Sequence, residues 1–205
     1  RAPAKTQAAL FEVMEERQIT IDGSAFQLDT PFLVIATQNP IEQEGTYRLP
    51  EAQLDRFLFK ITIDYPKLDE EILIIQREHL LQDHGKLEAI KTILSAEEIK
   101  GYQALVKQIR VEQNLLEYIA RIVVNTRENA FLYLGASPRA SIAILNASKG
   151  FAAIRGRDFV TPEDIKEAAI PVLQHRVIVT PEREMEGITS SEIIKQIIET
   201  VEIPR

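Results

Sequence analysis

The sequence predicts an α/β region followed by an all-helical bundle, and two observations support that order. Two strand-like apolar runs, residues 32–36 and 57–63, flank a polar loop and a short helical stretch. The first run is five residues long and ends at polar residues, which suits a fully buried strand of a parallel sheet. The composition then changes at Tyr65-Pro66, beyond which helical segments follow one another. We therefore expect an α/β region at residues 1–66 and an all-α region at residues 67–205.

The chain before the first run is expected to hold a helix and a hairpin. Pro3 suits the first turn of a helix over residues 4–17, in which apolar residues recur on one face. Asp22-Gly23, between two β-rich runs within residues 18–28, is a strong signal for a hairpin turn. Arg17 is the only cation nearby, so a surface hairpin or a protein contact is favoured over a hairpin that grips DNA.

Capping residues mark the helices of the second region. Ser95 and Glu98 form a capping box ahead of an amphipathic segment. Ser137-Pro138 and Thr161-Pro162 each place a capping residue before a proline that suits the first helical position. Pro171 must kink or end the helix that Thr161 opens, because a proline inside a helix lacks the amide donor. No period repeats along these segments, so we expect a bundle and not a solenoid.

Bulk composition excludes several classes of function. The chain carries 31 acidic and 24 basic residues, a net charge of −7, which argues against a nucleic-acid scaffold or a protein of anionic membrane surfaces. It has no cysteine, which excludes disulfides and Cys-zinc sites, and its three histidines lack the spacing of a metal site. No apolar run approaches the ~20 residues of a membrane span and no signal peptide is visible, so we expect a soluble, cytoplasmic protein.

Three polar residues are candidates for an anion site. Asn39 follows the first strand-like run, and ligands of open α/β sheets gather where strands end. Arg56 ends the short helix immediately before the second run. Arg139 lies in the first turn of a helix, where the positive end of the helix dipole disfavours a cation unless an anion is near. The alternatives are structural: Asn39 could cap the turn, and Arg56 could pair with Asp55, while Arg48 in the nearby loop is the competitor of Arg56.

Long motifs in this chain resemble the MoxR family of AAA+ ATPases. The resemblance is carried by TQNPIEQEGTYRLPEAQLDRF at residues 37–57, by GASPRA at 135–140, and by RAPAKTQAALFEVMEERQ at 1–18. The last of these resembles the segment that follows the family's Walker B motif. The similarity extends over most of the chain. It implies part of an AAA+ P-loop core, with sheet, hairpin and helices, followed by a helical lid bundle.

The resemblance implies a role for each candidate residue. Asn39 falls at sensor 1, which orients the attacking water near the γ-phosphate of ATP. Arg56 falls at the arginine finger, which reaches the nucleotide of the neighbouring subunit, and Arg139 falls at sensor 2. Arg48 is the candidate for a second contact with the neighbour's nucleotide. We therefore expect Asn39 and Arg56 to be catalytic and Arg139 and Arg48 to bind the nucleotide, with no metal ligand among them.

The chain departs from the family by lacking two motifs. It contains no G-x-x-x-x-G-K-[ST] and no strand that ends in Asp-Glu. ATP and Mg²⁺ are therefore expected to be held mainly by residues upstream of Arg1, and the 205 residues alone to be inactive. In the family the Walker A strand lies between the two strand-like runs. We expect that slot to be filled by another chain, or residues 1–66 to be rearranged, while the helical lid keeps its fold.

The function that the resemblance implies is ATP hydrolysis in a ring, expected to be a hexamer, which remodels or matures protein complexes as a chaperone does. Its partners would be protein clients or adaptors, including proteins with von Willebrand factor A domains, and not nucleic acid or the membrane interior. Two alternatives stay open: a magnesium-chelatase-type or helicase-type motor on the same fold, and a truncated assembly module without catalysis. The acidic hairpin and the net charge of −7 oppose the helicase.

Overall fold

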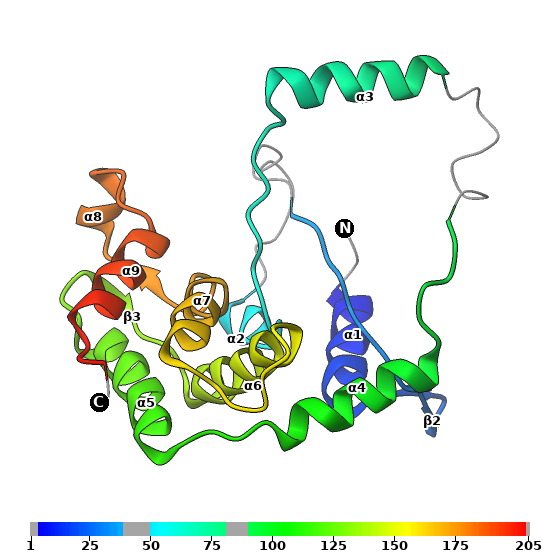
Figure 1. The fold of residues 1–205 in the computed structure, drawn as a ribbon, viewed down its shortest axis with the longest axis horizontal. Helices are drawn as coiled ribbons and strands as arrows, with labels where there is room; N and C mark the ends of the chain where they lie inside the picture. The colour runs from blue at the N-terminus through cyan, green and yellow to red at the C-terminus, as the bar shows by residue number, and fades with distance from the viewer. Residues whose placement is uncertain (1–3, 39–49, 81–89, 204–205) are drawn as a thin grey trace.

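The computed structural model describes residues 4–38, 50–80 and 90–203, whose arrangement Figure 1 shows. Helix α1 (Ala4–Glu16) lies beside a bundle of helices, and α3 (Leu68–Leu80) lies apart from that bundle at the top of the view. Four helices form the helical bundle: α5 (Gln113–Glu128), α6 (Pro138–Ile154), α7 (Pro162–Leu173) and α9 (Ser190–Thr200). The predicted order, a mixed region followed by a helical one, is confirmed.

The predicted helix and hairpin near the start of the chain are both present. After α1, strand β1 (Gln18–Ile21) pairs antiparallel with strand β2 (Ser24–Gln27). Between them Asp22 and Gly23 have φ of 48° and 80°, the left-handed conformation that a tight hairpin turn needs and that glycine adopts without strain. The Thr20 hydroxyl donates a hydrogen bond to the carboxylate of Glu12, which ties the hairpin to α1.

The prediction of a buried strand at residues 32–36 is wrong for this structure. Residues 32–36 and 57–63 form no helix and pair with no strand in the described part of the chain, and Leu33 and Ile35 are 80% and 81% exposed. A strand of a parallel sheet needs neighbours for its backbone groups. The strand that the resemblance places between these runs has no counterpart in the sequence, so neither run finds that neighbour. The short helix α2 (Glu51–Leu54) is present as predicted.

Aliphatic side chains from every helix of the bundle meet in one core. The buried cluster begins at Ile109 and ends at Val201. Its fully buried members include Ile122 of α5, Ile144 of α6, Ile165 of α7 and two isoleucines of α9. Burying each such side chain stabilises a fold by about 1.5–3 kcal/mol, so the helical bundle has the core of an independently packed unit.

The predicted helix caps are confirmed. Ser95 with Glu98 opens α4 (Ala96–Gln108) through a capping box, and Thr161 with Asp164 opens α7 in the same way. Ser137 caps α6 by accepting a hydrogen bond from the Arg139 amide at 3.2 Å. Pro171 lies inside α7, which ends two residues later at Leu173.

Three short elements lie in the region that we predicted as purely helical. Strands β3 (Leu132–Leu134) and β4 (Ile178–Val179) pair antiparallel, and α8 (Pro181–Met185) follows them. Two or three strand residues carry no periodic signal, and their partner is distant in sequence. Such elements are decided by the packing of the bundle rather than by local pattern.

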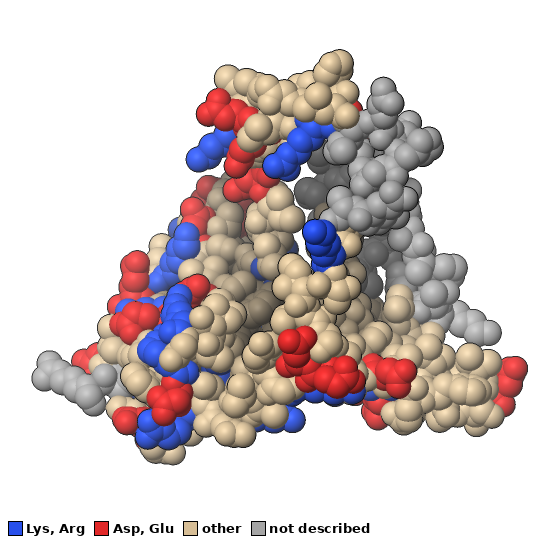
Figure 2. Space-filling model, turned by 45° about the vertical axis from the view of Figure 1, so that its right-hand side comes forward, with Lys and Arg blue, Asp and Glu red and all other residues tan. Residues whose placement is uncertain are grey.

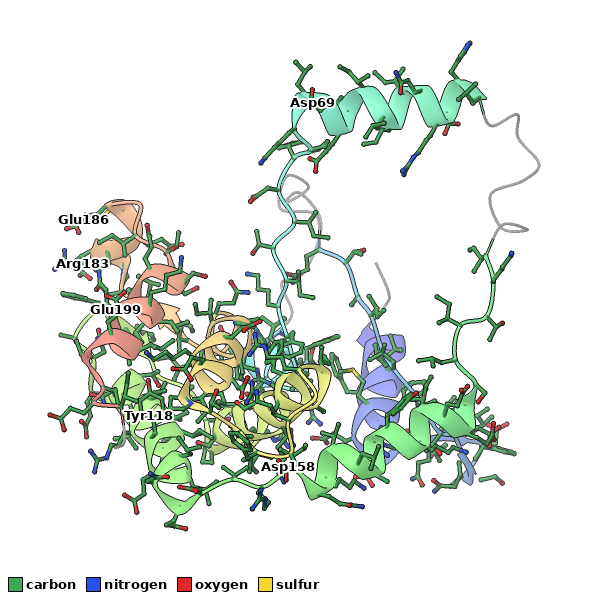
Figure 3. All side chains as sticks on the ribbon, viewed as in Figure 1. Asp69, Tyr118, Asp158, Arg183, Glu186 and Glu199 are labelled. Carbon is green, nitrogen blue, oxygen red and sulfur yellow. The ribbon has the colours of Figure 1, made fainter. Side chains whose placement is uncertain are left out.

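Helices α3 and α4 lie outside the core. Neither has a buried residue, and three isoleucines of α3, at positions 72, 74 and 75, are exposed. Figure 3 shows the side chains of α3 standing out on all sides of the helix, from Asp69 at its start onward. These two helices therefore contribute little to the stability of the bundle.

A buried carboxylate joins α6 to α7. Asp164 is fully buried and accepts hydrogen bonds from the guanidinium groups of Arg155 and Arg157 and from the Thr161 amide. Burial raises the pKa of Asp164, but these donors outweigh burial and lower that pKa to about 2. The carboxylate is therefore ionised and fully paired near neutral pH, as a structural element of the bundle.

Candidate functional site

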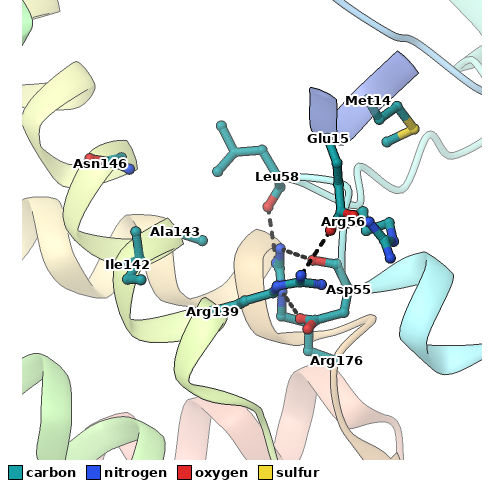
Figure 4. Close-up of a pocket in the computed structure, with 10 residues that line it drawn as sticks. All are labelled: Met14, Glu15, Asp55, Arg56, Leu58, Arg139, Ile142, Ala143, Asn146 and Arg176. Atoms are coloured by element: carbon teal, nitrogen blue, oxygen red, sulfur yellow. Dashed lines mark hydrogen bonds and ion pairs between the residues drawn. The ribbon is translucent and has the colours of Figure 1, made fainter. Parts of the chain in front are cut away.

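A hollow opens where α1, α6 and the chain after α2 meet, and Figure 4 shows the side chains around it. Its volume is about 260 Å³, and it is the place where two of the predicted site residues lie together. Ten residues line it: Met14, Glu15, Asp55, Arg56, Leu58, Arg139, Ile142, Ala143, Asn146 and Arg176. Three of these are arginines and two are acidic, so the hollow carries an excess of positive charge.

One carboxylate of the hollow holds two arginines. Glu15, near the end of α1, contacts the Arg56 guanidinium through Oε1, and Arg139 Nη2 lies 2.8 Å from the same oxygen. The Nε atom of Arg56 is buried and has no hydrogen-bond partner in the described structure. The side chain of Arg139 is 53% exposed, so its guanidinium also faces solvent. Two cations that share one carboxylate retain donors and charge for a further anion.

A second carboxylate, that of Asp55, connects the chain before Arg56 to the start of α6. Its Oδ1 accepts from Arg176 Nε at 2.8 Å, and its Oδ2 accepts from the Ser137 hydroxyl at 2.9 Å. Ser137 is the residue that caps the helix bearing Arg139. The alternative in which Arg56 pairs with Asp55 is therefore not what forms, because Asp55 binds Arg176 while Arg56 binds Glu15.

Arg176 was not predicted as a site residue, although it is the most completely bonded side chain in the hollow. Its side chain is 3% exposed, and its guanidinium donates to the Asp55 carboxylate and to four backbone carbonyls. Burial lowers the pKa of Arg176, and an arginine stays protonated even so. The only signal in the sequence is an arginine within an apolar stretch, which does not reveal a partner so distant along the chain.

The residues around Arg176 bind residues 55–60, which we call the 55–60 segment. The Lys60 amide donates to the Pro171 carbonyl at 2.9 Å, and the Gln174 side chain donates to the Lys60 carbonyl. His175 Nε2 donates to the Phe57 carbonyl at 3.0 Å, while burial and the Arg176 cation lower the pKa of His175 to about 4. The 55–60 segment is thus attached to the end of α7.

The glycine of the GASPRA motif lets the start of α6 approach the end of α5. A Cβ on Gly135 would lie 2.6 Å from the Cα atom of Arg127 and 2.7 Å from the Thr126 carbonyl oxygen. The next residue, Ala136, receives a hydrogen bond from Arg127 Nε at 2.8 Å and donates its amide to the Thr126 hydroxyl at 2.9 Å. This contact fixes where the helix that bears Arg139 begins.

Two of the four predicted site residues can be placed. Arg56 and Arg139 share the hollow, whereas Asn39 and Arg48 lie outside the described residues. Among the described residues no group of three or more His, Asp or Glu side chains is arranged to hold a metal ion. Over the same residues no helix has the length and apolar character needed to cross a membrane.

Family comparisons match both parts of the chain. Residues 1–59 match the ATPase family associated with various cellular activities (AAA), and residues 124–197 match the AAA lid domain. The chain is 42% identical over 204 residues to the protein YeaC of Bacillus subtilis, and 42% identical over 214 residues to the chaperone MoxR1 of Mycobacterium tuberculosis. Both alignments cover 100% of this chain, but only 63% and 55% of those two relatives.

A solved structure has the same fold. The crystal structure of a proposed ATPase from Cytophaga hutchinsonii superimposes with a TM-score of 0.91 at 39% sequence identity, covering 100% of this chain and 64% of that one. The chain therefore spans less than two thirds of the length of each of these three relatives.

Proposed function

Because the chain belongs to the MoxR family of AAA+ ATPases, we propose that it supplies the sensor and lid part of an enzyme that hydrolyses ATP. Residues 1–66 would be the later portion of the ATPase core, and residues 67–205 the lid. Since the chain spans only part of its relatives, the activity belongs to the complete protein that contains this chain.

The observation that carries this proposal is the convergence of Arg56 and Arg139 on one oxygen of Glu15. A phosphate group that enters the hollow would meet both guanidinium groups at once, with the unpartnered Nε of Arg56 as an additional donor. Arginine binds phosphate through parallel charge-assisted hydrogen bonds, which suits this arrangement. Glu15 would then act as a placeholder that a phosphate displaces.

The two arginines would act on the same nucleotide. Arg56 is the arginine finger, which stabilises the charge that develops on the transferred phosphoryl group, an effect worth ~10³ to 10⁵ in rate. Arg139, as sensor 2, binds the same phosphates from the first turn of α6. Arg56 and Arg139 line the same hollow. When Arg56 reaches the nucleotide of the neighbouring subunit, Arg139 would therefore reach that nucleotide as well.

The residues present fit a phosphate but not its metal. Bound ATP would supply the γ-phosphoryl group for attack by water, with Mg²⁺ offsetting its charge. The described residues offer arginines for the phosphate, while they hold no cluster of metal ligands, so Mg²⁺ would be bound elsewhere in the enzyme. Asn39 would orient the attacking water as sensor 1, and Arg48 would add a second contact across the interface.

The complete protein would work in the cytoplasm as a ring, which we propose to be a hexamer. The ring would remodel protein clients. A relative named as a chaperone supports the choice of a protein client, and adaptors with von Willebrand factor A domains are the proposed partners. Acidic and basic side chains are interspersed on the face that Figure 2 shows. A nucleic-acid motor would need a basic surface, which the net charge of −7 opposes for the chain as a whole, so we favour the protein-remodelling function.

The test is a subunit-mixing experiment on the complete protein. Arg56→Ala and Arg139→Ala should each lower kcat for ATP, the first by about 10³-fold or more. Mixing either variant with subunits that lack the Walker B carboxylate should restore activity, because some interfaces then join an intact site to intact arginines. Mixing Arg56→Ala with Arg139→Ala subunits should restore nothing, since no subunit of that mixture presents both arginines.

Arg110→Ala is the matched control, because Arg110 forms an exposed ion pair with Asp158 away from the hollow. It should leave kcat unchanged. If the two arginine variants rescue each other, they serve different nucleotides. If Arg56→Ala is as active as the unmodified protein, Arg56 is not a finger and the proposal fails.

A further inference from the structure

A buried arginine in the helical bundle is bonded almost entirely to the segment that bears Arg56. Arg176 follows α7, and its side chain is 3% exposed. Taking a guanidinium out of water is costly, and a pair buried in this way rarely adds net stability over a well-packed apolar side chain. Net stability alone therefore does not explain why this arginine is buried.

The Arg176 side chain donates five hydrogen bonds, and most of them go to one segment. One goes to the Val172 carbonyl of α7, the helix that precedes Arg176, and the other four go to the 55–60 segment. These four acceptors are the Asp55 carboxylate at 2.8 Å and the carbonyls of Asp55, Phe57 and Leu58 at 2.9, 2.6 and 3.1 Å. The acceptors come immediately before and after Arg56. The planar guanidinium of Arg176 therefore holds the backbone on both sides of Arg56.

The same carboxylate also reaches the other arginine of the hollow. Asp55 Oδ2 accepts from the Ser137 hydroxyl at 2.9 Å, and that hydroxyl accepts from the Arg139 amide at 3.2 Å. A chain of hydrogen bonds therefore runs from Arg176 through Asp55 and Ser137 to the backbone of Arg139. This chain therefore links the backbones of the two arginines that converge on Glu15.

We propose that Arg176 is a positioning residue, which acts through Asp55 and the carbonyls of the 55–60 segment to hold Arg56 on the lid, beside an Arg139 that α6 already holds in place. Arg56 then moves with the lid rather than with α1 or the rest of residues 1–66. The Lys60–Pro171 hydrogen bond and the packing of Phe59 on Phe151, with ring centroids 6.5 Å apart, support this attachment. The inference rests on the proposed role of Arg56 towards phosphate.

Lysine is the informative replacement for Arg176. It keeps the charge but lacks the planar fork, so it can reach only some of the acceptors of the 55–60 segment. In the complete protein we expect Arg176→Lys to lower kcat by about 10²-fold, as small misplacements of catalytic groups do. KM and the affinity for ATP should stay within about twofold, since the finger is needed in the transition state. Asp55→Asn should behave in the same way.

The decisive measurement is the double variant. If Arg176 acts only through the finger, Arg56→Ala with Arg176→Lys should be no slower than Arg56→Ala alone. Arg157→Lys is the matched control, because Arg157 also pairs with a buried carboxylate of the bundle, Asp164, but does not contact the 55–60 segment. It should lower the melting temperature while leaving kcat unchanged.

The outcomes separate the two proposals. An Arg56→Ala protein with undiminished kcat overturns the proposed finger itself. A large effect of Arg56→Ala, together with an additive loss in the double variant or a loss confined to KM, overturns only the positioning role. Should Arg176→Lys fail to fold, hydrogen exchange in the unmodified protein decides. The Lys60 amide, which donates to the Pro171 carbonyl, should then open together with the amides of residues 172–176, and free exchange at Lys60 beside protected amides at 172–176 contradicts the inference.

Discussion

Arg56 and Arg139, one after α2 and the other in the first turn of α6, contact the same oxygen of Glu15. The hollow therefore already contains an internal anion. Any external anion has to compete with a carboxylate that is already in place, and the strength of that competition can be measured directly.

Glu15→Gln should strengthen anion binding by the 205-residue chain. The substitution keeps the size of the side chain but removes the charge that neutralises the two arginines. We expect millimolar inorganic phosphate to raise the melting temperature of the variant more than that of the unmodified chain. Glu167→Gln is the control, since Glu167 binds Arg155 outside the hollow. Equal shifts for all three proteins would mean that the hollow does not bind phosphate.

Gly135→Ala should destabilise the chain by about 2 kcal/mol, because the added methyl group would overlap backbone atoms that cannot move aside. Gly101→Ala is the control within a helix, where a Cβ meets nothing within 4 Å. That control should be neutral or stabilising by up to ~1 kcal/mol. Urea unfolding of the two variants checks the difference, and an unaffected Gly135→Ala would contradict the close approach of α5 and α6.

His175 should make stability depend on pH between about 6.5 and about 4, because burial and Arg176 lower its folded pKa to about 4. The unfolded chain binds a proton in this window and the folded chain does not, so stability falls as the pH falls. The slope should approach about 1.4 kcal/mol per pH unit. Urea unfolding at several pH values measures it. His175→Gln should flatten the slope, and an unchanged slope would assign the effect to other groups.

Asp164 should govern a second, more acidic window. Its folded pKa of about 2 lies below the ordinary value of 3.8, so its contribution is complete above 3.8 and is lost as the pH falls towards 2. Asp164→Asn should cost about 3 kcal/mol at pH 7, since Arg155 and Arg157 lose a buried ionic partner. The same substitution should remove the loss of stability in this acidic window. A variant as stable as the parent at pH 7 would disprove the role of this cluster.

The 205-residue chain alone should release no phosphate from Mg²⁺-ATP. Its sequence holds no phosphate-binding G-x-x-x-x-G-K-[ST] loop, and in the proposed function Arg56 and Arg139 would act only on a nucleotide that other residues hold. A sensitive phosphate-release assay on the purified chain is sufficient. Turnover on the order of 1 s⁻¹, within the usual range of enzymes, would contradict this expectation.

The features that the sequence predicted well are those with local causes. Ser95, Ser137 and Thr161 cap helices through residues two or three positions away, and Asp22-Gly23 sets its own turn. The strand-like run at residues 32–36 failed because a strand needs a partner, which its own composition cannot supply.

The candidate site was predicted in part. The motifs singled out Arg56 and Arg139, but not their meeting at Glu15, because that contact joins three distant segments. Arg176 was missed for the same reason: its acceptors are mostly backbone carbonyls, which every residue has and which leave no trace in the sequence. Whether Asn39 and Arg48 join the site stays a prediction.

The contacts of Phe59 and Asp55 bear on where the chain can be cut to give a stable helical lid. Its ring packs on Phe151 of the bundle, while Asp55 is the ionic partner of Arg176. In a polypeptide that starts at residue 67, Phe151 would therefore lose the ring that packs on it, and the Arg176 guanidinium would lose its carboxylate partner. We expect such a polypeptide to recover its missing stability when a synthetic peptide of residues 55–60 is added in trans. Residues 55–60 would then fold cooperatively with the helical bundle, although they precede the change of composition at Tyr65-Pro66.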